Sequence, residues 1–148
     1  MKLSTKGRYG ARAMLELALH YGEGPLSVKE IAELQDISER YLENLMISLH
    51  SRGLVTSVRG KGGGFSLARA PGKIRLLEII HATEGSLSPV ACLDEPGTCG
   101  RSASCVTLEI WELVRQSLAD VLGSITLQDL VQRQAQKSEN EEALMYYI

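Results

Sequence analysis

The sequence predicts a mainly α-helical protein with a small β-hairpin wing, in which a winged helix-turn-helix is followed by a long dimerisation helix. Three observations lead to this prediction. Apolar residues recur at helical spacing in residues 5–20 and 39–52. Two short helical segments flank a tight turn at residues 36–38. A basic, glycine-rich segment at residues 57–66 then follows, as a wing would.

The first two helices have recognisable boundaries. A helix over residues 5–20 is indicated by the apolar positions Ala11, Met14, Leu15, Leu17, Ala18 and Leu19, and it ends at a glycine- and proline-containing turn. Ser27 stands three residues before Glu30, which is the spacing of a capping box. The second helix therefore begins after Ser27 and extends to about Leu34.

Ser38 is a good N-cap for a third helix over Glu39–Arg52, which Gly53 would end. Its apolar stripe consists of Tyr41, Leu42, Leu45, Met46 and Leu49. Ile37 is expected to pack in the turn. Helix, tight turn and helix together predict a helix-turn-helix motif.

The segment after the third helix predicts the wing. Residues 54–58 alternate as a strand, residues 60–64 can turn with positive φ, and residues 65–67 can form the returning strand. A flexible loop or a phosphate cradle is the alternative interpretation. The segment does not match GxxxxGK[ST], and no capped helix follows it, so nucleotide binding is not expected.

The second half of the chain predicts a helix over Leu76–Thr83, a loop over 85–104, a long helix over 106–123 and a short helix over Thr126–Gln136. The predicted organisation is a winged helix-turn-helix domain at 1–83 and a cysteine loop at 84–105. The dimerisation and terminal helices follow at 106–136, with a polar, flexible tail at 137–148.

Composition is typical of a globular protein, with 44% hydrophobic and 23% charged residues and a net charge of −2. The charge is unevenly distributed: residues 1–12 and 52–75 carry basic residues and no acids, whereas residues 139–142 hold three acids. The basic blocks are expected to form a surface for nucleic acid. No long apolar run or signal peptide is present, so we expect a cytoplasmic protein without a membrane segment.

The second helix of such a motif enters the major groove, and its first turns reach the base edges. The candidate residues here are Ser38, Arg40, Tyr41, Glu43 and Asn44. Arg40 suits guanine, Asn44 adenine and Glu43 the amino group of cytosine. A merely solvated helix face is the alternative.

Arg59 in the wing is the candidate for insertion into the minor groove, with Lys61 on a phosphate. Further backbone contacts are expected from Lys2, Ser4, Lys6, Arg8 and Tyr9. The predicted partner is therefore double-stranded DNA.

All three cysteines, Cys92, Cys99 and Cys105, stand in one loop, separated by six and five residues. Thiolates select zinc or iron–sulfur clusters, and an odd number of cysteines fits a disulfide framework poorly. Three free buried thiols are the alternative. The fourth ligand is open: Glu109 is a weak candidate, as are Asp94, Glu95, His20, His50 and His81, a residue of a second subunit, or an exogenous thiol.

The helix over 106–123 is apolar along one side. Burying it against a second copy would form a C₂ dimer that reads a palindromic operator, with two recognition helices one DNA turn apart. Packing against its own domain is the alternative. A thiol enzyme and a zinc-stabilised interaction module are rival functions, but there is no CxxC and no nucleophile–base motif, so neither an enzyme nor a small-molecule substrate is expected.

The segments 1–10, 41–45 and 53–65 and the three-cysteine loop together resemble the bacterial iron–sulfur cluster regulators, the IscR-like and NsrR-like winged-helix repressors. The resemblance spans nearly the whole chain. It implies a homodimeric transcriptional regulator with Arg59 in the minor groove and Cys92, Cys99 and Cys105 as cluster ligands. In IscR-like members the cluster is [2Fe–2S] and reports iron–sulfur supply, whereas NsrR-like members sense nitric oxide. Relatives in cysteine metabolism carry no cluster.

Three features of the sequence depart from the family pattern. The first cysteine gap is six residues where IscR-like proteins usually have five, and Leu108 stands where they carry a histidine ligand. An acidic ligand near the N-terminus of the partner, as in NsrR-like members, does not transfer because position 8 is Arg8. The expected function is a regulator controlled by a [2Fe–2S] cluster. A [4Fe–4S] sensor of nitric oxide or redox state, or a cluster-free zinc or thiol regulator, is the alternative.

Overall fold

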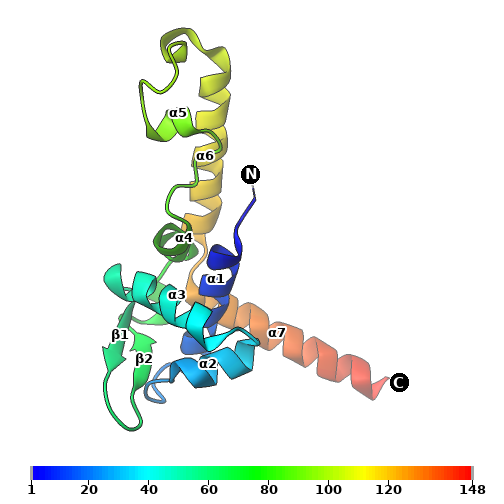
Figure 1. Ribbon diagram of the computed structural model, residues 1–148. Helices are drawn as coiled ribbons and strands as arrows, with labels where there is room; N and C mark the ends of the chain where they lie inside the picture. Colours follow the sequence, from blue (N-terminus) through cyan, green and yellow to red (C-terminus); the bar gives the residue numbers. More distant parts are fainter. Residues whose placement is uncertain (1, 148) are drawn as a thin grey trace.

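A computed structural model describes residues 2–147 of the chain. In order, the elements are α1 (Thr5–Leu19), α2 (Val28–Gln35), α3 (Glu39–Ser51), β1 (Val55–Val58), β2 (Gly64–Leu67), η1 (Pro71–Lys73), α4 (Leu76–Glu84), α5 (Ala91–Asp94), η2 (Ser102–Ser104), α6 (Val106–Ser124) and α7 (Leu127–Tyr146). Helices α1–α4 and the β1–β2 hairpin form the compact part, from which α6 and α7 project (Figure 1). The predicted fold class, mostly helical with a two-stranded wing, is confirmed.

One hydrophobic core holds the compact part together. It is formed by the apolar stripes of α1, α2 and α3, by α4, and by the strand ends nearest to them. Ile37 in the helix-turn-helix turn is buried, as the sequence predicted. The largest fully buried side chains among the described residues are Met14, Ile31, Leu42, Met46, Leu49, Leu54, Ile74, Ile79, Ile80 and Leu127. The core therefore fixes α3 and the wing relative to one another.

The wing is an antiparallel pair in which Val55 lies opposite Leu67 and Val58 opposite Gly64. Leu26, before α2, extends the sheet by exchanging backbone hydrogen bonds with Phe65 at 2.9 and 2.7 Å. Gly64 has a φ of 151°, and a Cβ there would lie 2.1 Å from the carbonyl oxygen of Leu26. A glycine is thus required at this position for the wing to approach the segment before α2.

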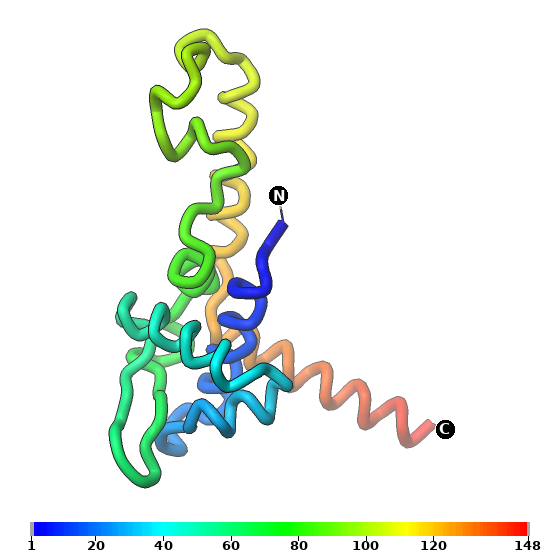
Figure 2. The backbone as a smooth tube through the Cα atoms, viewed as in Figure 1, coloured from blue at the N-terminus to red at the C-terminus, as the bar shows by residue number. Residues whose placement is uncertain are grey.

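Helix α6 leaves the compact part and carries the cysteine loop at its far end, at the opposite end of the molecule from the wing (Figure 2). None of its residues is buried in this chain. The large apolar side chains exposed along it are Val106, Ile110, Trp111, Leu113, Leu118 and Val121. Within residues 85–104, which the sequence predicted as a loop, only the short turns α5 and η2 are helical.

The last helix differs from the prediction. It was expected to end at Gln136, but α7 continues to Tyr146, so that end was wrong. Residues 127–146 contain no glycine or proline, and their glutamines, glutamates, lysine and alanines favour helix, so a polar helix continues into solvent. Its first turn is anchored, because Leu127 N donates to the oxygen of Ile74 at 3.0 Å.

Among residues 2–147, no helix combines the length and the hydropathy needed to span a membrane.

Candidate DNA-binding surface and cysteine loop

Helix α3 presents the predicted reading residues to solvent. The hydroxyl of Ser38 accepts a hydrogen bond from the backbone N–H of Tyr41 at 3.1 Å, which caps the helix and fixes where it begins. Leu42, Leu45, Met46 and Leu49 are buried on one side. Arg40, Glu43 and Asn44 are exposed on the other side, as the sequence predicted. The first turns of α3 are thus free to meet a groove.

Ile47 is a member of this face that the sequence prediction omitted. It follows Glu43 and Asn44 by four and three residues, so it lies on the same side of the helix. Its side chain is 65% exposed. Helical spacing, which places Ile47 off the apolar stripe, was the sequence signal that could have identified it.

The two predicted tyrosine contacts, Tyr9 and Tyr41, pack on each other. Their ring centroids lie 5.8 Å apart in an edge-to-face arrangement, and both side chains are partly buried against the core. The guanidinium of Arg12 lies 5.3 Å from the centroid of the Tyr9 ring. The tyrosines therefore join α1 to the beginning of α3, whatever else they contact.

The N-terminal basic segment lies at the beginning of α1, where Lys2, Lys6 and Arg8 are exposed. Ser4, predicted as a DNA contact, has internal partners. Its hydroxyl caps α1 by accepting from the N–H of Lys6 at 3.1 Å and donates to a carboxylate oxygen of Glu84 at 2.5 Å. The structure therefore gives Ser4 a structural role beside any contact with phosphate.

The wing tip holds Arg59 and Lys61, both exposed in the turn between β1 and β2. The glycines on either side of Lys61 take positive φ, with values of 95° at Gly60 and 76° at Gly62. The tip is therefore a narrow turn that presents two cations to solvent, which suits insertion next to a sugar–phosphate backbone.

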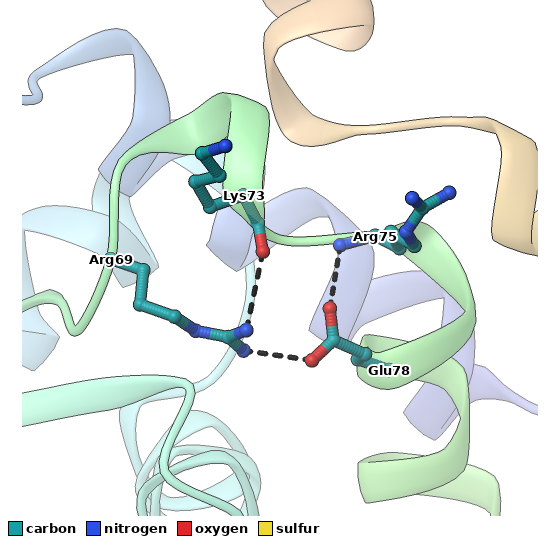
Figure 3. Close-up of polar contacts among 4 residues, drawn as sticks. All are labelled: Arg69, Lys73, Arg75 and Glu78. Carbon is teal, nitrogen blue, oxygen red and sulfur yellow. Dashed lines mark hydrogen bonds and ion pairs between the residues drawn. The ribbon is translucent and has the colours of Figure 1, made fainter.

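Two arginines of the basic segment 52–75 form intramolecular contacts. Figure 3 shows Arg69 donating to the carbonyl oxygen of Lys73 at 3.2 Å and pairing with the carboxylate of Glu78 at 2.8 Å. Glu78 also accepts from the N–H of Arg75, and the Arg75 guanidinium donates to the carbonyl oxygen of Gly123. Burial raises the pKa of Glu78, but these hydrogen bonds and cations outweigh it and lower that pKa below its usual value. Arg69 and Arg75 thus secure the beginning of α4 and the end of α6.

The capping role of Ser38 leads to a stability prediction. Ser38→Ala is expected to lower the free energy of unfolding by about 1 kcal/mol, because the N–H of Tyr41 loses its acceptor. Ser38→Gly should lower it by only a few tenths of that amount, since water can then reach the free N–H. Urea unfolding followed by circular dichroism measures both. Equal losses for the two variants would contradict the capping role.

The three cysteines occupy three different local environments. Cys92 lies in α5, Cys99 is exposed in the loop that follows, and Cys105 immediately precedes α6. All three are free thiols. The Cys105 sulfur lies 3.2 Å from the hydroxyl of Thr107. This contact and the backbone N–H of Leu108 lower the pKa of the Cys105 thiol, which favours the thiolate that binds metals.

The donor types fit an iron–sulfur cluster or a zinc ion, but their positions do not form a ligand set. Within residues 2–147, no three histidine, cysteine or acidic side chains are grouped closely enough to hold a metal ion. Cys92, Cys99, Cys105 and the weak candidate Glu109 are therefore not brought together here.

Three of the other suggested fourth ligands, Asp94, His81 and His20, have partners within the protein. Each carboxylate oxygen of Asp94 accepts from a serine hydroxyl, one of Ser86 and one of Ser88, both at 2.6 Å, and these bonds lower the pKa of Asp94. The Nδ1 atoms of His81 and His20 lie 3.0 Å from the carbonyl oxygens of Gly85 and Glu16, respectively. Asp94 thus fixes the linker between α4 and α5.

Known proteins match this chain over most of its length. The sequence pattern of the Rrf2 family, described as an iron-dependent transcriptional regulator, matches residues 3–133. The regulator CymR of Bacillus subtilis (strain 168) is 43% identical over 148 residues, covering 100% of both chains. The regulator IscR of Xenorhabdus nematophila is 42% identical over 134 residues, covering 90% of this chain and 81% of the relative.

Solved structures agree with the sequence matches. The structure of B. subtilis CymR, described as the global cysteine regulator, superposes with a TM-score of 0.73 at 43% identity, covering 90% of this chain and 98% of the other. That of T. potens IscR superposes with a TM-score of 0.74 at 46% identity, covering 90% and 88%. These relatives are regulators and not enzymes. The chain belongs to the Rrf2 family of helix-turn-helix transcriptional regulators.

Proposed function

We propose that the chain is a homodimeric, sequence-specific DNA-binding regulator whose operator affinity is set at the cysteine loop. One observation carries the DNA interface: the exposed side of α3 and the exposed cations of the wing belong to one compact part, fixed by a common core. In this proposal α3 enters the major groove and the wing lies on the adjacent minor groove.

Each exposed residue of α3 has a base chemistry that suits it. Arg40 suits the paired acceptors of guanine, Asn44 the donor and acceptor of adenine, and Glu43 the amino group of cytosine. Ile47 offers the apolar surface that a thymine methyl group contacts. Arg59 inserts into the minor groove, and Lys61, Lys2, Lys6 and Arg8 bind phosphates, while Ser38, Ser4, Tyr9 and Tyr41 position these elements.

The apolar face of α6 supports the homodimer. Val106, Ile110, Leu113 and Val121 are 50–74% exposed and recur at spacings that place them along one side of the helix. A second copy of α6, packed antiparallel, would cover this face in both chains. A palindromic operator is the DNA that such a dimer reads.

For the cysteine loop we favour an iron–sulfur cluster, [2Fe–2S] rather than [4Fe–4S], held by Cys92, Cys99 and Cys105. Three soft donors in one loop and a family described as iron-dependent support it. The cluster would act by linkage, favouring one arrangement of the loop and α6 and thereby the spacing of the two α3 helices. A coupling free energy of about 1–3 kcal/mol corresponds to about 5–150-fold regulation.

A cluster-free thiol regulator is the second candidate. The full-length similarity to CymR, described as a cysteine regulator, favours it, and so do the three sulfurs that are not grouped as ligands. In this candidate the exposed Cys99 and the low-pKa Cys105 thiol would respond to oxidation or to thiol modification.

Anaerobic purification with iron, sulfide and zinc analysis distinguishes these candidates. We expect about two iron and two sulfide per chain with visible absorption bands. Cys99→Ala should lose both iron and the bands, whereas Ser104→Ala, in the same loop, should keep them. About four iron and four sulfide per chain would indicate the [4Fe–4S] alternative. Colourless, iron-free wild-type protein under cluster supply would contradict the cluster and leave the thiol regulator.

A further inference from the structure

A single carboxylate oxygen holds the beginning of α1. Oε1 of Glu84 accepts three hydrogen bonds, from the N–H of Ser4 at 2.8 Å, from the hydroxyl of Ser4 at 2.5 Å and from the N–H of Gly7 at 3.0 Å. Glu84 is the last residue of α4 and lies 80 positions from Ser4 in the sequence. The first turn of α1 thus receives a second capping acceptor, beside the Ser4 hydroxyl, from another helix.

Two glycines in α1 allow this close approach. A Cβ on Gly7 would lie 2.6 Å from Oε1 of Glu84, and a Cβ on Gly10 would lie 2.6 Å from the side-chain methyl carbon of Thr83. Both glycines are buried and helical, so their conformations do not themselves require glycine. The space they leave is what the end of α4 occupies.

The contact between Glu84 and α1 lies between the N-terminal basic segment and the linker to the cysteine loop. On one side are Lys2 and Lys6, the exposed cations of the N-terminal basic segment. On the other side is Gly85, which follows Glu84 with a φ of 81° and begins the linker to the cysteine loop. Helix α1 packs against α4, and α4 packs against α6.

The same contact removes one way of binding phosphate. A helix N-terminus attracts anions through its free N–H groups. In α1 the N–H groups of Ser4 and Gly7 already donate to Glu84, and that of Lys6 donates to Ser4. Three N–H groups at this helix end are therefore not available to a phosphate, which leaves contacts with DNA mainly to side chains, whose geometry depends on how the segment is held.

We propose that Glu84 is a positioning residue for DNA binding, which fixes the N-terminal basic segment against α4 so that Lys2 and Lys6 meet the phosphates in an ordered arrangement. The inference rests on the DNA interface proposed above. Glu84 acts through hydrogen bonding rather than through its charge, because a carboxylate beside these lysines would by itself oppose phosphate binding.

The test compares Glu84→Ala and Glu84→Gln on one selected operator duplex. Glu84→Ala should bind about tenfold more weakly, since two or three long side chains must then be ordered on binding. The slope of its log K against log salt concentration should also be smaller in magnitude by about one to two, because phosphate contacts are lost. Glu84→Gln keeps an acceptor oxygen and should bind within about threefold of wild type.

Two further variants keep the result interpretable. Glu139→Gln removes the same charge from the exposed end of α7 and should change neither affinity nor salt slope. Gly7→Ala pushes Oε1 of Glu84 aside but gains helix propensity, which offsets part of the lost stability, so it should weaken binding as Glu84→Ala does. It decides the question even if Glu84→Ala fails to fold.

The outcomes separate this inference from the DNA interface itself. A wild-type protein that binds no selected duplex would contradict the interface and, with it, the role of Glu84. Wild-type binding with an unchanged affinity and salt slope in Gly7→Ala and Glu84→Ala would overturn only the role of Glu84. Glu84→Gln binding as weakly as Glu84→Ala would overturn it as well, because the charge would then be what matters.

Discussion

Leu127→Ala is expected to lower the free energy of unfolding by about 2–5 kcal/mol, the range for truncating a fully buried leucine. Leu127 is 0% exposed and belongs to the same core as α1–α4, although it is the first residue of the projecting helix α7. Removing its side chain leaves a cavity where α7 is anchored. Urea unfolding, followed by circular dichroism, measures the loss.

Leu144→Ala is the matched control, with the same substitution on the same helix at a side chain that is 66% exposed. It should change stability by less than about 0.5 kcal/mol. Similar small losses at both positions would mean that the first turn of α7 adds nothing to the core.

Arg59→Ala is expected to weaken binding to a selected operator by about 1–3 kcal/mol, or about 5–150-fold. The exposed guanidinium at the wing tip is the group proposed to enter the minor groove, where the negative potential is strongest when the groove is narrow. Because the tip lies at the opposite end of the molecule from the cysteine loop, the iron and sulfide content should not change. Fluorescence anisotropy at fixed salt measures the affinity.

Arg133→Ala removes the same charge from the exposed surface of α7 and serves as the control. It should bind within about twofold of wild type, because surface charges away from the interface contribute little at physiological salt. An Arg59→Ala variant that binds as tightly as Arg133→Ala would remove the wing from the proposed interface.

The helix-turn-helix could be predicted because its signals are local. Ser38, the capping box at Ser27 and Glu30, and the apolar period of α3 each lie within a few residues, and the structure has all of them. The wing followed from the alternation in residues 54–58 and from the glycines, since turn geometry is also local. At the ends of α1–α4, the predicted boundaries differ from the structure by at most one residue.

One local feature and two features that depend on tertiary contacts were missed. The continuation of α7 to Tyr146 was missed because a polar segment without an apolar stripe was interpreted as a tail. The carboxylate of Glu84 meets Ser4 across 80 residues, and no local pattern indicates such a contact. Arg69 belonged to a basic block that suggested DNA, yet it forms an intramolecular ion pair with Glu78 at the surface.

The cysteine loop illustrates the same limit for chemistry. Residue types identified three soft donors, and spacing suggested a loop around a cluster, but neither fixes where the sulfurs lie. Glu109 as a fourth ligand rested on its helical spacing from Cys105, which places two residues on one face without bringing the other cysteines to them. Ligand sets formed between chains or around a bound group cannot be predicted from spacing alone.

The central claim is that the state of the cysteine loop sets the affinity for DNA. Its most direct test titrates one labelled operator duplex, under anaerobic conditions and at one salt concentration, with cluster-loaded protein and with the same preparation after removal of the cluster. We expect the two affinities to differ by about 5–150-fold, with both forms remaining dimeric. Equal affinities of the loaded and cluster-free forms would contradict the claim.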